Sequence, residues 1–226
     1  MTPTLTWRDG VFLKHGVPHW ILSGSIHYFR IHPDLWEDRL RRVAATGFNT
    51  VDTYVAWNFH EPDEGSPDFT GPRDLARFVT IAGDLGLDVI VRPGPYICAE
   101  WTNGGLPSWL TARTRAPRSS DPVYQDAVAR WFDTLLPQLV PLQAGHGGPV
   151  VAVQVENEYG SYGDDAAHLT WLRQGLLDRG ITELLYTADG PTEVMLDAGM
   201  VEDTLAAATF GSRAEEAHSV SYTHLR

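Results

Sequence analysis

The sequence predicts an α/β protein, a (β/α)8 barrel (TIM barrel) of which this chain supplies about six of the eight β/α units. Three observations lead to this prediction. Short apolar segments rich in β-branched residues alternate with amphipathic segments of helical period along the chain. Glycines follow the amphipathic segments, as they do where helices end and the chain returns to a strand. At 226 residues, the chain is a little shorter than the ~250 residues of a typical complete barrel.

Each predicted strand is an apolar run whose carboxyl end turns polar. The clearest is 150–158, V-V-A-V-Q-V-E-N-E, which begins with the consecutive apolar residues of a strand buried on both faces of a parallel sheet. Before the first strand, Asp9-Gly10 and His15-Gly16 are turn signals that predict a small hairpin capping the domain. In chain order, the strands are expected at residues 21–30, 48–57, 87–93, 150–158, 184–189 and 204–210.

The predicted helices follow from apolar spacing, N-terminal caps and glycine stops. Asp121 and Pro122 begin a long helix, which Pro137 is expected to kink or end. The stretch before it, 93–120, has no periodic pattern and is longer than ordinary connections, which indicates a functional loop. The helices are expected at residues 33–47, 73–85, from 121 onward, 164–180 and 193–199.

The composition excludes several classes of partner. A formal net charge of −12 argues against nucleic acid and anionic membranes, which require a basic face, and favours a neutral ligand. Cys98 is the only cysteine, so neither an internal disulfide nor a thiolate zinc site is available. The sequence shows no cationic leader and no apolar segment of membrane-spanning length, so we expect a cytoplasmic protein.

Polar and aromatic residues gather at three predicted strand ends, 54–61, 96–101 and 156–159. The carboxyl ends of barrel strands share one rim, where the active sites of this fold lie. Carboxylates and amides bind sugar hydroxyls, and aromatic rings stack on the apolar faces of sugars. The motifs G-x-x-x-x-G-K-[ST], G-x-G-x-x-G, G-x-S-x-G and H-E-x-x-H are absent from the sequence. The rim therefore predicts carbohydrate chemistry rather than phosphate chemistry.

Four sequence blocks resemble one known family. In chain order they are S-G-S-I-H-Y-F-R, T-Y-V-A-W-N-F-H-E-P, V-R-P-G-P-Y-I-C-A-E-W and V-Q-V-E-N-E-Y-G. They are similar to blocks of the glycoside hydrolase family 35 β-galactosidases, and the resemblance runs from about residue 10 to about residue 216. It implies a β/α barrel that removes terminal non-reducing β-D-galactose with retention of configuration. One carboxylic acid would act as acid/base and one carboxylate as nucleophile, without a metal or an organic cofactor.

The resemblance also implies roles for individual residues. By position in these blocks, Glu158 would be the general acid/base and Asn157 would bind the sugar 2-hydroxyl. Cys98 is expected to be a packed thiol, because no neighbouring base or metal-ligand set would activate it as a nucleophile. The substrate-binding residues implied by the resemblance are Tyr54, Cys98, Ala99, Glu100 and Asn157.

Two of these assignments have competing interpretations. Side chains alternate along a strand, so Glu156 and Glu158 would face the same way, and periodicity alone does not choose between them. A position nearer the open rim favours Glu158 as the catalytic group, with Glu156 in a hydrogen-bonded layer below it. Glu100 could form a buried ion pair with Arg92 instead of binding a sugar.

The C-terminal part departs from the family pattern. The resemblance places the nucleophile at the end of a seventh strand, which this sequence does not reach. We therefore interpret the chain as a truncated N-terminal part of the barrel, inactive by itself and prone to aggregate through open strand edges. Residues 1–217 would form the partial catalytic domain. Residues 218–226, H-S-V-S-Y-T-H-L-R, are interpreted as an artefactual tail translated from a sequencing adapter.

Other functions remain open from the sequence. A galactoside-binding barrel without catalysis would account for the missing nucleophile, and a few rim substitutions would give a related exo-β-glycosidase such as an exo-β-glucosaminidase. A metal-dependent hydrolase would use His27, His60 or His146, whose scattered positions argue against it. The leading interpretation has a small-molecule or oligosaccharide β-galactoside as its partner, and no nucleic acid or membrane. Linkage preference and oligomeric state are not predicted.

Overall fold

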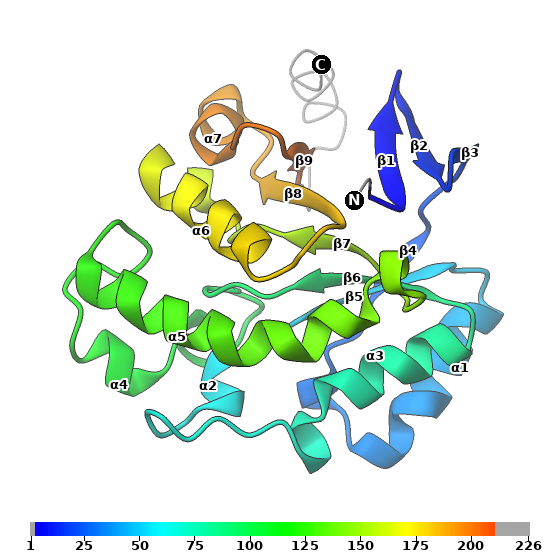
Figure 1. Cartoon of the computed structure of the whole chain (residues 1–226), viewed down its shortest axis with the longest axis horizontal. Coiled ribbons are helices and arrows are strands. Elements are labelled where there is room, and N and C mark those ends of the chain that lie inside the picture. The colour runs from blue at the N-terminus through cyan, green and yellow to red at the C-terminus, as the bar shows by residue number, and fades with distance from the viewer. Residues whose placement is uncertain (1–2, 211–226) are drawn as a thin grey trace.

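The computed structural model describes residues 3–210. Parallel strands follow one another in a single sheet in the order of the sequence, with helices packed against the sheet (Figure 1). The connections between consecutive strands contain helices, so the sheet is an incomplete (β/α)8 barrel, as predicted. The strands are β4 (Ser23–Ser25), β5 (Thr50–Tyr54), β6 (Asp88–Arg92), β7 (Val150–Gln154), β8 (Leu184–Asp189) and β9 (Leu205–Ala208).

A second, antiparallel sheet lies at the amino ends of these strands (Figure 1). Lys14 Nζ lies 2.6 Å from Asp88 Oδ1 at the start of β6. The backbone N–H of Thr4 donates to Glu183, just before β8, over 2.7 Å. The predicted hairpin is therefore present, is extended by a third strand, and caps the amino end of the barrel. Its strands are β1 (Leu5–Arg8), β2 (Val11–Lys14) and β3 (Val17–Pro18).

Several helices begin after a residue whose side chain satisfies an N–H group of the first turn. The side chains of Asp74, Asp121 and Asp165 each accept a hydrogen bond from the first turn of a helix. The long helix α5 runs through Pro137 and ends at Leu139, so the missing N–H affects only its last turn. The helices are α1 (Trp36–Ala45), α2 (Trp57–His60), α3 (Leu75–Asp84), α4 (Ser108–Thr111), α5 (Pro122–Leu139), α6 (Ala166–Asp178) and α7 (Glu193–Gly199).

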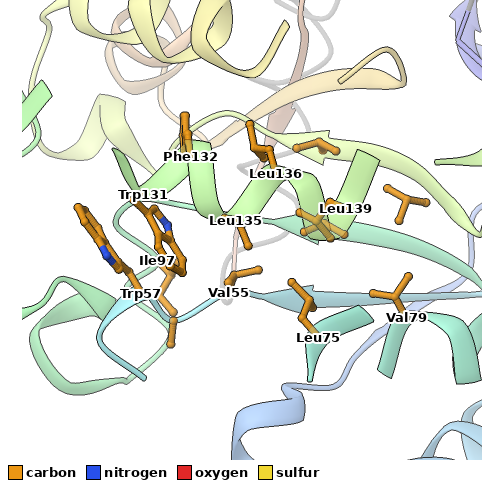
Figure 2. Packing of buried hydrophobic residues seen from close by; sticks show 14 of the residues in the cluster. Val55, Trp57, Leu75, Val79, Ile97, Trp131, Phe132, Leu135, Leu136 and Leu139 are labelled. Atoms are coloured by element: carbon orange, nitrogen blue, oxygen red, sulfur yellow. The ribbon is translucent and has the colours of Figure 1, made fainter. Parts of the chain in front are cut away.

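The main core lies between the sheet and its helices. Figure 2 shows Leu135 and Leu139 of α5 directed toward the strands, and Leu75 of α3 belongs to the same buried cluster. At one end of this cluster, the ring of Trp131 stacks on Trp57 with their centroids 5.5 Å apart. Full burial of each leucine, valine or phenylalanine side chain in this cluster contributes about 1.5–3 kcal/mol to the free energy of unfolding. The core thus fixes the strands whose carboxyl ends carry the predicted site.

All the parallel strands except β8 are shorter than predicted, and two of them are shorter because their polar ends leave the sheet early. The segment predicted as a strand over 21–30 is extended only at Ser23–Ser25 and then forms a 3-10 turn at Tyr28–Arg30. The strand predicted over 150–158 ends at Gln154. Glu156, at φ 59°, then turns the chain out of the strand direction. These polar ends belong to loops of the site and not to the strands.

Three further expectations concern the C-terminal tail, the open strand edges and membrane-spanning segments. Residues 218–226, interpreted as an artefactual tail, lie outside the described residues. Within residues 3–210, the two edge strands of the parallel sheet are β4 and β9. No helix in that range has the length and apolar character needed to cross a membrane.

Candidate active site

The polar ends of four neighbouring strands meet at one edge of the parallel sheet. Tyr54 ends β5, Arg92 ends β6, Gln154 ends β7 and Asp189 ends β8. Because these strands are parallel and adjacent, the four residues lie at the carboxyl edge, opposite the N-terminal hairpin (Figure 1). This is the end at which (β/α)8 barrels place their active sites.

Asn157 is held in one orientation by three side chains. Its Oδ1 accepts hydrogen bonds from the Tyr54 hydroxyl over 3.2 Å and from Arg92 Nη2 over 2.9 Å. Gln154 Nε2 lies 3.3 Å from the same oxygen. Since a guanidinium only donates, the amide atom that faces Arg92 must be the oxygen. The Nδ2 group of Asn157 has no hydrogen-bond acceptor within residues 3–210 and remains available as a donor.

Arg92 organises the side chains around this amide. It donates to Gln154 Oε1, lies 3.8 Å from Asp52 Oδ2 and sits 4.0 Å from the centroid of the Tyr54 ring. Burial raises the pKa of Tyr54 to about 12, and the Arg92 charge offsets only part of this effect. Tyr54 is therefore a neutral phenol near pH 7, and its hydroxyl donates to Asn157.

Glu156 is the buried partner of Arg118. Arg118 Nε and Nη2 donate to the two carboxylate oxygens over 2.9 Å and 2.7 Å, and Nη2 also donates to the Asn157 carbonyl over 2.7 Å. Glu156 is only 1% exposed. Burial raises the pKa of Glu156, while the Arg118 charge acts in the opposite direction. The bidentate geometry is that of an ion pair, so Glu156 anchors the loop.

Glu158 has a different set of partners. Its backbone N–H donates to the Ala188 carbonyl of β8 over 3.0 Å. Its half-buried side chain accepts a hydrogen bond at Oε1 from Thr209 Oγ1 over 3.1 Å. The argument that Glu156 and Glu158 face the same way is wrong, because both lie beyond β7 in left-handed conformations, with φ 59° and 49°. Of these two glutamates, only Glu158 has a carboxyl group without a cationic partner among the described residues.

Three consecutive residues of the long loop after β6 are left-handed. Cys98, Ala99 and Glu100 have φ values of 54°, 53° and 43°. This conformation costs a non-glycine residue about 1–2 kcal/mol, so surrounding contacts must hold it. Arg30 does so, since its Nη2 donates to the Ala99 and Glu100 carbonyls. The thiol of Cys98 is half-buried and free.

The carboxylate of Glu100 is exposed at this turn. The alternative that Glu100 pairs with Arg92 is not what the structure shows, because Arg92 forms its ion pair with Asp52. An exposed carboxylate on a fixed backbone can accept hydrogen bonds from ligand hydroxyls.

The structure brings the predicted site residues to the same edge of the sheet. Tyr54 and Asn157 are in direct contact, and Glu158 follows Asn157 in the chain. The 98–100 turn is connected to them through Arg30, which contacts His27, and the His27 ring lies 5.2 Å from the Tyr54 ring.

Sequence reasoning did not assign Arg118, Gln154 or Thr209 to the site. Arg118 belongs to the irregular stretch 93–120, whose length was the available signal. Gln154 is the polar residue within the apolar run of β7. No sequence signal marks Thr209, because it follows the last apolar strand without a motif of its own.

The three histidines considered for a metal site contact different parts of the protein, and His27 contacts Arg30. His60 is buried between the Tyr28 hydroxyl and the Asp68 carbonyl, and burial lowers its pKa to about 4. His146 Nδ1 contacts the Val140 carbonyl. Within residues 3–210, no three His, Cys, Asp or Glu side chains are grouped so as to hold a metal ion.

Comparison with known proteins shows the family to which this chain belongs. The model of the family described as glycosyl hydrolases family 35 matches residues 11–225. The chain is 49% identical to a β-galactosidase of Mus musculus over 204 residues, which cover 89% of this chain and 32% of that protein. It is 49% identical to β-galactosidase-1-like protein 3 of Homo sapiens over 197 residues, or 87% and 30% of the two chains. The chain thus spans about a third of the length of these curated relatives.

Solved structures show the same fold at lower identity. A GH5_18 protein from Streptomyces cattleya, in complex with GlcNAc, has a TM-score of 0.58 and 21% identity, with 75% of this chain and 44% of that chain covered. The exo-β-1,4-mannosidase Op5Man5 from Opitutaceae bacterium strain TAV5 has a TM-score of 0.59 and 20% identity, with 80% and 34% covered. At these identities the likeness concerns the fold alone.

Proposed function

The chain belongs to glycosyl hydrolases family 35. From this premise, we propose that it forms part of the catalytic domain of a retaining, exo-acting β-galactosidase. The protein would release terminal non-reducing β-D-galactose from small or oligomeric β-galactosides. The observation that carries the proposal is the neighbouring pair Asn157 and Glu158, which combines an oriented amide donor with a carboxyl group that has no cationic partner within residues 3–210. Both lie at the carboxyl edge of the sheet, beside a neutral tyrosine and an exposed carboxylate.

Glu158 is the proposed general acid/base. In a retaining mechanism, one carboxyl group protonates the glycosidic oxygen while a carboxylate about 5–5.5 Å away attacks the anomeric carbon. The first residue then takes a proton from the water that attacks the galactosyl intermediate. Glu156 is unsuited to this role, because Arg118 occupies both of its oxygens. We assign the nucleophile to residues outside the described range.

Asn157 and Tyr54 are the proposed sugar-binding groups nearest the reacting carbon. The free Nδ2 donor of Asn157 suits the oxygen of the sugar 2-hydroxyl, a contact that strengthens in the transition state of retaining glycosidases. Arg92 keeps this donor in place by holding the amide oxygen. The Tyr54 hydroxyl donates to Asn157, so its own lone pairs are left to accept a proton from a second sugar hydroxyl.

The 98–100 turn would bind the remaining hydroxyls of the galactose. Glu100 offers two carboxylate oxygens, which fit a pair of adjacent sugar hydroxyls. Cys98 and Ala99 offer backbone groups that Arg30 fixes through the Ala99 carbonyl. The left-handed conformation of all three residues fits a turn whose shape is maintained for binding.

The test is hydrolysis of p-nitrophenyl β-D-galactopyranoside by the complete product of the reading frame and by this 226-residue chain alone. We expect turnover by the complete product, with β-galactose as the first anomer seen by proton NMR. Glu158→Gln should lower kcat by about 10²–10⁴-fold, because the water that attacks the galactosyl intermediate then lacks its base. Glu202→Gln, an exposed carboxylate between α7 and β9, is the control and should leave kcat/KM unchanged.

Each other outcome points to a different account. Full activity in Glu158→Gln would contradict the proposed acid/base, and α-galactose as the first product would contradict retention. Galactose binding by calorimetry without any turnover would favour the binding barrel. Preferential hydrolysis of p-nitrophenyl β-glucosaminide would redirect the proposal to a related exo-β-glycosidase.

A further inference from the structure

Thr209 places a hydroxyl group between the proposed acid/base and the end of β8. Its Oγ1 lies 3.1 Å from Glu158 Oε1 and 3.0 Å from the Asp189 carbonyl oxygen. Its backbone N–H donates to the same carbonyl over 2.7 Å. Thr209 directly follows β9, whose last residue Ala208 pairs with Asp189. The sheet itself therefore fixes the position of the hydroxyl.

The hydroxyl has one proton and two acceptors within reach. The Asp189 carbonyl already accepts the Thr209 N–H, at the shorter of its two contacts with this residue. Glu158 Oε1 has no other hydrogen-bond donor within residues 3–210. A carbonyl oxygen can accept two hydrogen bonds, but a carboxylate is the stronger acceptor, so we assign the hydroxyl proton to Glu158 Oε1.

We propose that Thr209 is a positioning residue for Glu158: its hydroxyl occupies Oε1, so that the catalytic proton is carried on Oε2. This inference rests on the proposed role of Glu158. In the acid form, Oε1 is the carbonyl oxygen that accepts from Thr209, and Oε2 bears the proton. As the glycosidic bond breaks, its electron pair stays on the leaving oxygen, which takes the proton from Oε2. In the second step, Oε2 takes a proton from the attacking water, and Thr209 remains the donor to Oε1.

The loop that carries Glu158 has anchors that do not depend on the Thr209 side chain. The Glu158 N–H donates to the Ala188 carbonyl over 3.0 Å, and the Gly160 N–H donates to Asp189 Oδ1 over 2.7 Å. The bond from the Thr209 N–H to Asp189 uses backbone atoms only. Removal of the hydroxyl therefore releases the Glu158 carboxyl group while the backbone around it keeps its place.

The kinetic test compares two leaving groups in the complete protein. An alkyl β-galactoside such as lactose depends strongly on acid assistance, whereas p-nitrophenolate leaves with little help. Thr209→Val, which keeps the shape of the side chain, should lower kcat/KM for lactose about tenfold, the effect of one lost hydrogen bond to a catalytic group. The same variant should lower kcat/KM for the p-nitrophenyl substrate by less than about threefold, and the inhibition constant of galactose should not change.

Two further variants separate positioning from packing. Thr209→Ser restores the hydroxyl and should recover most of the lactose activity. Thr187→Val, on β8, removes a buried hydroxyl that has no hydrogen-bond partner in the described part of the chain, and it should leave kcat/KM unchanged for both substrates. Equal losses on the two substrates, failure of serine to rescue, or weakened galactose inhibition in Thr209→Val would each overturn the proposal.

A spectroscopic measurement tests the contact without turnover. Isotope-edited infrared spectra at low pH report the C=O stretch of the protonated Glu158 carboxyl group, which is assigned by its loss in Glu158→Gln. A carbonyl that loses a hydrogen-bond donor stretches at higher frequency, so Thr209→Val should raise this band and Thr209→Ser should not. An unmoved band would overturn the role of Thr209. A protein without β-galactoside hydrolysis but with the shifted band would instead refute the proposed function alone.

Discussion

The two ends of the parallel sheet use left-handed backbone in different ways. At the amino end, where the chain enters its strands, glycines adopt it at Gly47, Gly86, Gly147 and Gly180. Asp203 is the exception in these connections, and Asp9 and His15 adopt the conformation in turns of the N-terminal hairpin; Asp and His are residue types that tolerate it. At the carboxyl end, the left-handed residues include seven with side chains, Cys98, Ala99, Glu100, Asn103, Arg118, Glu156 and Glu158. The carboxyl end therefore contains strained, non-glycine backbone in the loops whose side chains form the proposed site.

The two ends also differ in how they hold charge. At the amino end, Lys14 and Asp88 form an ion pair whose side chains retain 29% and 13% of their exposure. At the carboxyl end, Arg118 and Glu156 retain 7% and 0%. A buried pair depends on both partners, because an unpaired charge out of water is costly, whereas a surface pair contributes little. At the carboxyl end, the buried Arg118–Glu156 pair therefore holds the shape of the loops that carry the proposed site.

The largest effect should come from breaking the buried pair. Arg118→Ala leaves Glu156 buried without its cation and should lower the free energy of unfolding by about 3–5 kcal/mol. Urea denaturation measures this loss. Arg113→Ala, in the same loop, breaks an exposed pair with Glu64 and should cost about 0–1 kcal/mol. Similar losses in the two variants would remove the distinction between buried and surface charge.

A smaller effect concerns a second buried carboxylate at the same end. Burial raises the pKa of Asp189 to about 6, above the value near 3.9 of an unfolded chain. Between these values the native state binds more protons than the unfolded state, so this group lowers stability as pH rises. Asp189→Asn keeps an oxygen acceptor for the Gly160 N–H and removes the titration.

We therefore expect the variant to gain stability relative to the unchanged protein as pH rises from 4 to 7. The gain should reach about 2 kcal/mol, measured as the difference between urea unfolding free energies at the two pH values. A difference that stays constant over this range would show that Asp189 does not titrate as its burial requires.

The smallest effect tests the glycines of the amino end. Gly86 has φ +77° and no heavy atom within 4 Å of an added Cβ, so Gly86→Ala changes backbone strain alone. It should cost about 1–2 kcal/mol. Gly175→Ala, inside α6 with only ordinary contacts around an added Cβ, should instead stabilise by about 0.5–1 kcal/mol. Thermal melts of both variants check the opposite signs, and equal shifts would contradict the role of φ.

Hydrophobic periodicity predicted the elements of the fold and some of their ends. The strand predicted at 184–189 and the helix predicted at 193–199 have these bounds in the structure. Periodicity failed at 156–158, because the left-handed turn there is held by side-chain contacts that no local pattern encodes. Arg118 is 38 residues from Glu156, and Thr209 is 51 residues from Glu158. Such pairs become visible only once the sheet has placed its strand ends side by side.

The assignment of site residues to sugar binding came from the four family-like blocks, and it remains a prediction. What the structure adds is a physical distinction between two carboxylates of one loop. The carboxylate of Glu156 is bound by Arg118, while the Glu158 carboxyl group accepts a hydrogen bond only from the Thr209 hydroxyl among the described residues. This distinction is the basis for assigning catalysis to Glu158.

The most direct measurement of that assignment is azide rescue of Glu158→Ala in the complete protein. The substrate is 2,4-dinitrophenyl β-galactoside, whose leaving group departs without a proton, so the galactosyl intermediate forms and then waits for a base that the variant lacks. Azide needs no base, so it should attack the anomeric carbon, restore turnover and yield β-galactosyl azide. Glu156→Ala should not be rescued. Failure of azide to accelerate Glu158→Ala, or rescue of Glu156→Ala in its place, would contradict the account.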